Sequence, residues 1–234
     1  MQTKQDVRFL DRLRAIGAQH YHDKHEFNRA MHAGALTREQ MRGWVANRYY
    51  YQKNIPVKDA AILSNLPDRA KRRVWIKRIL NQDGTLESGG GGLELWFALG
   101  RAVGLSDAKL TAETEVQPGT RRAVDSYVTF ARTQPWLPAV ASSLTELFAP
   151  ELMTQRIEAL LARYPWIDPT GLEYFRTRVT LAQEDSDRAL PWVLEEARDA
   201  RTQEACLAAL RFKCDVLWAI LDAIQGAYGI GPPP

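Results

Sequence analysis

A charged side chain interrupts an apolar helical face in the segment that follows Thr37. Arg48 has helical spacing from Met41 and Trp44, and Tyr51 and Gln52 continue the same face. A buried guanidinium is costly unless an acid, a carbonyl or an anionic ligand lies beside it. For a single residue of this kind, a core salt bridge or a side chain that reaches the surface is a commoner explanation than a ligand site.

A second charge breaks the apolar face of the last predicted helix. Lys213 is the only charged member of the face formed by Cys206, Leu210, Leu217 and Ile220. Two such cations on different helices favour an interior polar cavity that accepts carboxylates. Further candidates for this cavity are Tyr174 and Arg178, four residues apart, and Arg156, expected beside Glu146.

The histidines and cysteines argue against a metal site and a thiol nucleophile. All four histidines fall in one segment, His20 to His32, and no Glu precedes a His by three residues as in helical di-iron sites. No further His or Cys has zinc-ligand spacing. His22 is therefore a candidate for hydrogen bonding or proton transfer, with a half-buried helical histidine as the alternative. Cys206 and Cys214 stand in apolar patterns, where thiols are usually inert.

The glycine-rich stretch "NQDGTLESGGGG", residues 81–92, does not match a phosphate-binding loop. Such a loop follows a strand and ends in Gly-Lys-Ser/Thr, whereas here a predicted helix precedes the glycines and no lysine follows them. A flexible connector between helices, with a turn at Asp83-Gly84, and one wall of an active site remain as alternatives.

The elements that position these residues are predicted to be helices almost throughout. Thr37 and Gln40 form a capping box, and Pro56 is expected to end or restart the helix that follows. Apolar spacing of three and four, with caps and prolines, predicts about eight or nine helices. Their expected ranges after the first are 67–80, 93–103, a short helix capped by Ser106, 121–130, 139–148, 150–164, 168–180 and 202–228.

Length and composition describe one ordinary globular domain. The 234 residues can bury one core, so residues 1–234 are expected to be a single all-α domain that ends in a short Gly/Pro-rich tail, 229–234. The net charge of +3 is small, and the basic residues are dispersed, so nucleic acid is not expected as a partner. No stretch of 18 uncharged apolar residues and no apolar leader occurs, so we expect a cytoplasmic protein without a membrane partner.

Five consecutive blocks of the chain carry a family resemblance. They are "GWVANRYYYQKNIPVKDAAIL", "RRVWIKRIL" with "NQDG", "SSLTELFAP", "EYFRTR" and "LRFKCDVLW". In order and spacing, from about residue 21 to 228, they resemble the pyrroloquinoline-quinone (PQQ) synthase family. The resemblance implies an all-α, heme-oxygenase-like fold without heme, usually in a homodimer. It also implies ring closure and oxidation of a quinoline precursor bearing several carboxylates, with dioxygen as co-substrate, PQQ as product and no metal or organic cofactor.

The same resemblance places the family's pocket residue by residue. Residues matched to catalytic positions are His22, Gln82, Tyr127, Tyr174, Arg178 and Lys213. Those matched to substrate-binding positions are Tyr21, Arg48, Tyr51, Gln52, Lys58, Arg78, Thr145, Glu146, Arg156 and Arg176. We expect Arg48, Arg156, Arg178 and Lys213 to hold carboxylates. Tyr174 and Arg178 would frame the oxygen site, and His22, Tyr127 or Lys213 would move protons.

The chain departs from the family's pattern in three places. Gln82 stands where the family typically has a histidine, in Asp-His-Asp-Gly, and Met153 stands where a histidine often follows "LFAP". The first-helix run His-Pro-Phe-His is here His25-Glu26-Phe27-Asn28. Because glutamine and methionine cannot shuttle protons near neutral pH, these changes predict intact ligand binding with reduced activity.

Two other functions remain open at this stage. A non-catalytic relative that binds PQQ or its precursor as a carrier or sensor would explain the changes at Gln82 and Met153. A helical hydrolase or transferase would need an activated nucleophile, for which the sequence offers no candidate.

Overall fold

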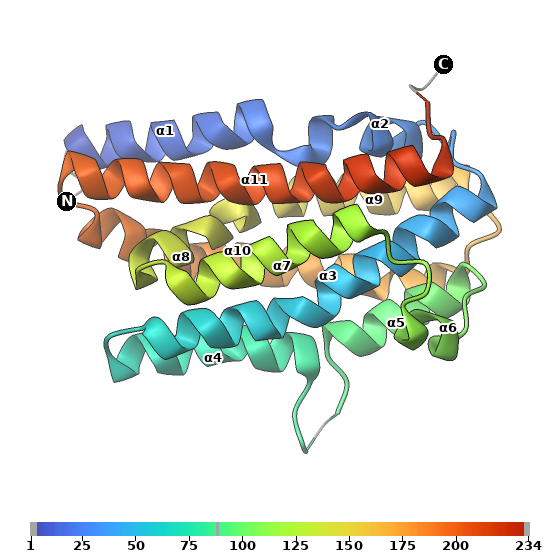
Figure 1. Cartoon of the computed structure of the whole chain (residues 1–234), viewed down its shortest axis with the longest axis horizontal. Coiled ribbons are helices and arrows are strands. Elements are labelled where there is room, and N and C mark those ends of the chain that lie inside the picture. The colour runs from blue at the N-terminus through green and yellow to red at the C-terminus, as the bar shows by residue number, and fades with distance from the viewer. Residues whose placement is uncertain (1–3, 88, 232–234) are drawn as a thin grey trace.

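The computed structural model describes residues 4–87 and 89–231, which form helices joined by short connections (Figure 1). No strand occurs in these residues, and Thr85 and Gly89 form one isolated bridge. The expectation of an all-α protein is therefore confirmed. No helix in the described part of the chain is long and apolar enough to cross a lipid bilayer.

The first half of the chain contains the helices that carry Arg48 and Gln82. In chain order these elements are α1 (Lys4–His20), the 3₁₀-helix η1 (His22–Lys24), α2 (Glu26–His32), α3 (Arg38–Asn65), α4 (Arg69–Asp83), α5 (Gly92–Ala102) and α6 (Asp107–Ala112). Thr37 and Gln40 form the predicted capping box at the start of α3. Ser106 caps α6, as expected.

The second half contains the helices that carry Arg156, Arg178 and Lys213. These elements are α7 (Pro118–Thr133), α8 (Trp136–Ser142), η2 (Ser143–Leu147), α9 (Ala149–Arg163), η3 (Pro169–Leu172), α10 (Glu173–Glu196) and α11 (Ala200–Tyr228). Gly229, at φ 59°, ends α11, and Ile230 is buried against the core. The last three residues of the predicted tail lie outside the described residues.

Two helices extend beyond the ends that were expected for them. α3 continues past Pro56 to Asn65, and α10 continues past residue 180 and Pro191 to Glu196. The predicted number of helices was also too low for the described residues, because α1 and α2 were not among the predicted ranges. α2 has only seven residues, too few for an apolar repeat to show.

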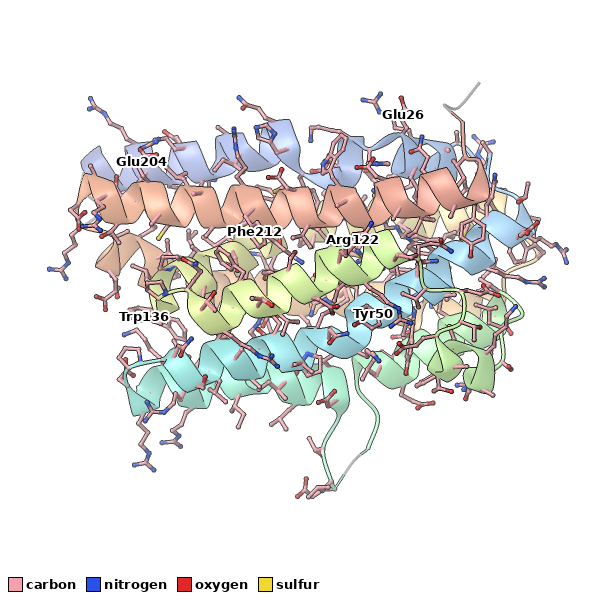
Figure 2. The ribbon with its side chains drawn as sticks, in the orientation of Figure 1. Glu26, Tyr50, Arg122, Trp136, Glu204 and Phe212 are labelled. Carbon is pink, nitrogen blue, oxygen red and sulfur yellow. The ribbon has the colours of Figure 1, made fainter. Side chains whose placement is uncertain are left out.

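The described side chains include two hydrophobic clusters. One is rich in aromatic side chains and includes Trp44, Trp96 and Phe175, while the other includes Phe9, Leu13 and Leu210. α11 runs along the length of the molecule beside α1 and α7 (Figure 1). Figure 2 shows Phe212 projecting from α11 beside α7, where its ring stacks on Phe130 at 4.6 Å between centroids.

Candidate active site

A polar cavity lies where the two hydrophobic clusters meet, and Tyr51 packs against both clusters. The cavity volume is about 60 Å³. Its lining residues come from α3, α4, α5, α9, α10, α11, η1 and η2 and from Tyr21, which lies between α1 and η1. The site is thus assembled from segments distant in sequence.

Three buried cations at the cavity have no carboxylate partner among the described residues. No Asp or Glu oxygen lies within 4.0 Å of the side-chain nitrogens of Arg48, Arg156 or Lys213. Arg48 Nη1 and Arg156 Nε also lack any hydrogen-bond partner. Because an unpaired buried charge is costly, these three side chains are suited to an anionic ligand.

Aromatic rings hold the three unpaired cations in place. Arg48 lies 4.4 Å from the centroid of the Tyr51 ring, and Arg156 lies near the rings of Trp44 and Phe175. Lys213 Nζ donates a hydrogen bond of 2.6 Å to Tyr51 Oη and lies 3.9 Å from the centroid of Tyr127. The quadrupole of each ring attracts the cation without neutralising it.

A second part of the cavity wall contains paired charges. Arg178 Nη2 lies 2.6 Å from Glu146 Oε2, and Arg78 Nη1 lies 2.9 Å from Asp185 Oδ2. Arg78 also contacts Asp59 and Glu146, at 3.3 and 3.4 Å. Burial alone would raise the pKa of Glu146, but Arg178 and Arg78 hold it below its usual value. The described side chains in and beside the cavity therefore include one group of unpaired cations and one group of charges that neutralise each other.

Gln82 occupies a hydrogen-bonding position that Pro56 leaves open. A helical residue normally donates its N–H to the carbonyl four residues earlier, and proline has no N–H to donate to Gln52 O. Gln82 Nε2 donates to this oxygen at 3.1 Å and to Gln52 Oε1 at 3.3 Å. Tyr174 Oη donates to the same Oε1 at 2.8 Å.

The glycine-rich loop after α4 packs directly on Gln82. A Cβ at Gly92 would lie 2.3 Å from Gln82 Oε1, and Gly91 has a φ of 98°. A second cavity, of about 410 Å³, lies under this loop, and Gln82, Tyr174 and Arg178 line both cavities. The three side chains therefore form the partition between the inner and the outer cavity.

His22 is buried and hydrogen-bonds with Asn28. Its Nδ1 lies 3.4 Å from Asn28 Nδ2, and Asn28 Oδ1 accepts a 2.8 Å hydrogen bond from Arg156 Nη2. Burial, followed by the charges of Arg48 and Arg156, lowers the pKa of His22 well below 6.5. His22 is thus neutral at physiological pH and has a ring nitrogen that can accept a proton or a hydrogen bond.

Burial also changes the protonation of Lys213. Burial first, then the charges of Lys58 and Arg48, lower the pKa of Lys213 well below 10.5. The neutral amine of Lys213 therefore forms at a lower pH than in an exposed lysine. Its hydrogen bond to Tyr51 connects it to the cavity. Burial raises the pKa of Cys206 and Cys214 to about 12, which agrees with inert thiols.

Residues 10–223 match the model of the TENA/THI-4/PQQC family. The chain belongs to this family. A protein named pyrroloquinoline-quinone synthase from Pseudomonas syringae pv. tomato is 51% identical over 226 residues, which cover 97% of this chain and 89% of the relative. Proteins of the same name from Pseudomonas putida (strain F1) and Granulibacter bethesdensis are each 50% identical, with 97% and 92% of this chain covered, and 89% and 84% of the relatives.

Several solved structures share the fold of this chain at low sequence identity. A domain with a heme oxygenase-like fold from Shewanella denitrificans has a TM-score of 0.74 at 11% identity, covering 97% of this chain and 92% of that one. A TenA homologue from Pseudomonas syringae pv. tomato also has a TM-score of 0.74, at 12% identity, covering 94% and 92%. The expected heme-oxygenase-like fold is confirmed.

Most side chains that the family resemblance selected converge on the inner cavity. Its lining includes Tyr21, His22, Arg48, Tyr51, Gln52, Arg78, Gln82, Thr145, Glu146, Arg156, Tyr174 and Arg178. Lys213, Tyr127 and Lys58 lie behind Tyr51, with both amines facing the Tyr127 ring. Met153 lines the cavity, with its sulfur 4.0 Å from Arg156 Nη1.

Two sequence-based expectations about the site were wrong. Arg176 is exposed and bonds to Pro169 O and Glu173, because the helical turn between residues 174 and 178 directs position 176 away from the cavity. Arg156 does not lie beside Glu146, which pairs with Arg178 and Arg78 instead. The cavity lining also contains two buried acids that the sequence did not indicate, Asp59 and Asp185.

Proposed function

We propose that this chain is a pyrroloquinoline-quinone synthase, which catalyses the last step of PQQ formation. The observation that carries the proposal is an identity of about 50%, over nearly the whole chain, to proteins of that name. The internal cavity supports it because its chemistry fits a ligand with several carboxylates. The carrier or sensor function has no observation in its favour, and the proposal does not require it.

The charge of the cavity supports binding of a polycarboxylate quinoline. In and beside the cavity, the described residues include six basic side chains and three acidic ones. The basic ones are Arg48, Lys58, Arg78, Arg156, Arg178 and Lys213, and the acidic ones are Asp59, Glu146 and Asp185. The excess is located at the unpaired Arg48 and Arg156, which line the cavity and would each accept a ligand carboxylate, and at Lys213, which lies behind Tyr51.

Dioxygen is the proposed electron acceptor. Each two-electron oxidation of the precursor releases two electrons and two protons. One dioxygen molecule that accepts the two electrons and the two protons becomes hydrogen peroxide. We expect the neutral His22 ring, and the Lys213 amine acting through Tyr51, to take protons from a bound ligand. The lowered pKa of both groups and the contact between Lys213 and Tyr51 support this expectation. Tyr174 and Arg178 adjoin this space and would frame the oxygen site.

Further parts of the proposal come from the sequence and the family resemblance. PQQ is the product, the reaction uses neither a metal nor an organic cofactor, and the chain acts as a cytoplasmic homodimer. Three measurements test these statements separately. Activity after treatment with chelators tests the absence of a metal, sedimentation of the purified chain tests the homodimer, and fractionation of cells tests the cytoplasmic location.

A bacterium that lacks its own PQQ synthase but makes the precursor provides the test of function. Expression of this chain is expected to restore PQQ in the culture, as measured by chromatography and absorbance. The doubly neutralised variant Arg48→Gln/Arg156→Gln is the control and is expected to restore none. Accumulated precursor without PQQ in cells that contain folded wild-type chain would contradict the proposal.

A further inference from the structure

Asp185 is a buried acid of the cavity lining with no assigned role. It lies on α10, is 4% exposed, and directs Oδ2 toward the two arginines of the paired wall. The distance from Oδ2 is 2.9 Å to Arg78 Nη1 and 3.7 Å to Arg178 Nη1. Asp185 Oδ1 lies 3.9 Å from the partly exposed Arg188.

Asp185 and Glu146 together form an alternating ring of charge with the two arginines. Glu146 contacts Arg178 at 2.6 Å and Arg78 at 3.4 Å, so each guanidinium touches both carboxylates. Asp59 adds a third contact to Arg78 at 3.3 Å. Arg78 donates hydrogen bonds to Asp59 and Glu146, and Arg178 donates one to Glu146. Asp185 attracts both guanidinium groups as an ion-pair partner without a hydrogen bond, so its charge restricts where the two groups lie.

The carboxylates of the ring also neutralise positive charge on the two arginines. Arg78 and Arg178 share Glu146 and Asp185, whereas Arg48, Arg156 and Lys213 have no carboxylate within 4.0 Å in the described part of the chain. Removing one carboxylate would leave Arg78 and Arg178 with charge available to an anionic ligand. The two arginines would then compete with the unpaired cations for the ligand's carboxylates.

We propose that Asp185 is a positioning residue that fixes Arg78 and Arg178 and offsets their charge. Through this contact, the two arginines orient the ligand's ring system and do not capture its carboxylates. Asp185 thereby limits how tightly the site holds its anionic product. The inference rests on the proposed function for its rate effect, but its effect on affinity needs only product binding.

The test compares Asp185→Asn with Asp187→Asn. Asp187 is exposed on the same helix, with Gln183 as its partner, and so is the matched control. For Asp185→Asn we expect the Kd for PQQ to fall about tenfold and kcat to fall at least about tenfold, since the ligand is held more tightly in a less productive position. For Asp187→Asn we expect both to stay within about twofold of the wild type.

Weaker PQQ binding, or unchanged kcat and Kd, in a folded Asp185→Asn protein would overturn the proposal, because a purely structural role predicts no gain in affinity. If that variant does not fold, Asp185→Glu replaces it, since it keeps the charge but moves the carboxylate by one methylene. The kcat of Asp185→Glu is expected to fall with little change in its Kd for PQQ. A kcat equal to that of the wild type in this variant would refute the positioning role. A wild-type chain that binds PQQ without making it contradicts the proposed function alone, and one that binds no PQQ contradicts both.

Discussion

Arg48, Arg156 and Lys213 differ from the other buried cations of the site in their partners. Arg78 and Arg178 are neutralised by Glu146 and Asp185, whereas the three unpaired cations have aromatic rings and amide groups as neighbours. These neighbours offset part of the cost of burying the charges, and a bound anion would offset more of it. We therefore expect the unpaired cations to bind the ligand and the paired Arg78 and Arg178 to orient it.

Replacing Arg178 with alanine is expected to weaken PQQ binding and oxidation together. Glu146 would lose its 2.6 Å partner and keep only the longer contact with Arg78, which leaves an excess of negative charge beside the cavity. We expect Kd to rise at least about tenfold and kcat/KM to fall by more, measured by fluorescence titration and steady-state kinetics. Arg176→Ala, two residues away and exposed, is the control and should match the wild type. Wild-type affinity in Arg178→Ala would contradict this role.

A histidine at position 82 is expected to accelerate oxidation. Gln82 lies at the cavity but cannot exchange a proton near neutral pH, whereas an imidazole there could. For Gln82→His we expect a rate at least about tenfold higher, and a new rise in rate as the pH increases through about 6.5. Rates of quinone formation between pH 5.5 and 8.5 test this, with Asn81→His as control. A variant with the wild-type rate and pH profile would show that this position carries no proton.

At the scale of elements, Pro56 connects the course of α3 to the position of Gln82. Pro56→Ala restores an N–H that can donate to Gln52 O, in competition with Gln82 Nε2. We expect this variant to be at least as stable as the wild type, because alanine favours a helix interior and proline does not. Replacing Gln82 with alanine should then cost about 1 kcal/mol less in Pro56→Ala than in the wild type. Denaturant unfolding of the four proteins gives this coupling, and additive losses would refute it.

The same elements show what the sequence could and could not predict. Caps at Thr37 and Ser106 and the spacing around Arg48 and Lys213 were local signals, and the structure confirms the helices that they indicated. Pro56 and residue 180 were expected to limit helices, but tertiary packing extends both helices beyond them. This extension explains why Asp185 was missed, since it lies two helical turns after Arg178. Which acid pairs with which arginine depends on contacts between helices, so Glu146 could not be assigned from spacing.

At the scale of the whole molecule, stability is expected to fall as the medium becomes acidic. Burial lowers the pKa of His22 well below 6.5 and lowers that of His32 to about 4. The unfolded chain, with ordinary histidine pKa values, therefore binds more protons below pH 6.5 than the folded chain does. Their contribution to stability is complete above pH 6.5 and is lost as the pH falls from there toward 4.

Thermal unfolding between pH 7.5 and 5 measures this dependence. We expect Tm to decrease toward pH 5, and to decrease less steeply in His22→Gln, which removes one of the two groups that take up a proton on unfolding. The comparison uses the slope with pH, because the substitution also lowers Tm at every pH. Equal slopes in both proteins would show that His22 is not held neutral by the fold.

The most direct test of PQQ synthesis by this chain is to mix the purified chain with the ring-open quinoline precursor without oxygen and then admit air. We expect a tight, unoxidised complex in the absence of oxygen, since the unpaired cations bind the carboxylates before any chemistry. The absorbance of PQQ is expected to appear only after air enters, with release of hydrogen peroxide. A complex that stays unoxidised in air would contradict the synthase function, and no complex at all would contradict the carboxylate-binding cavity.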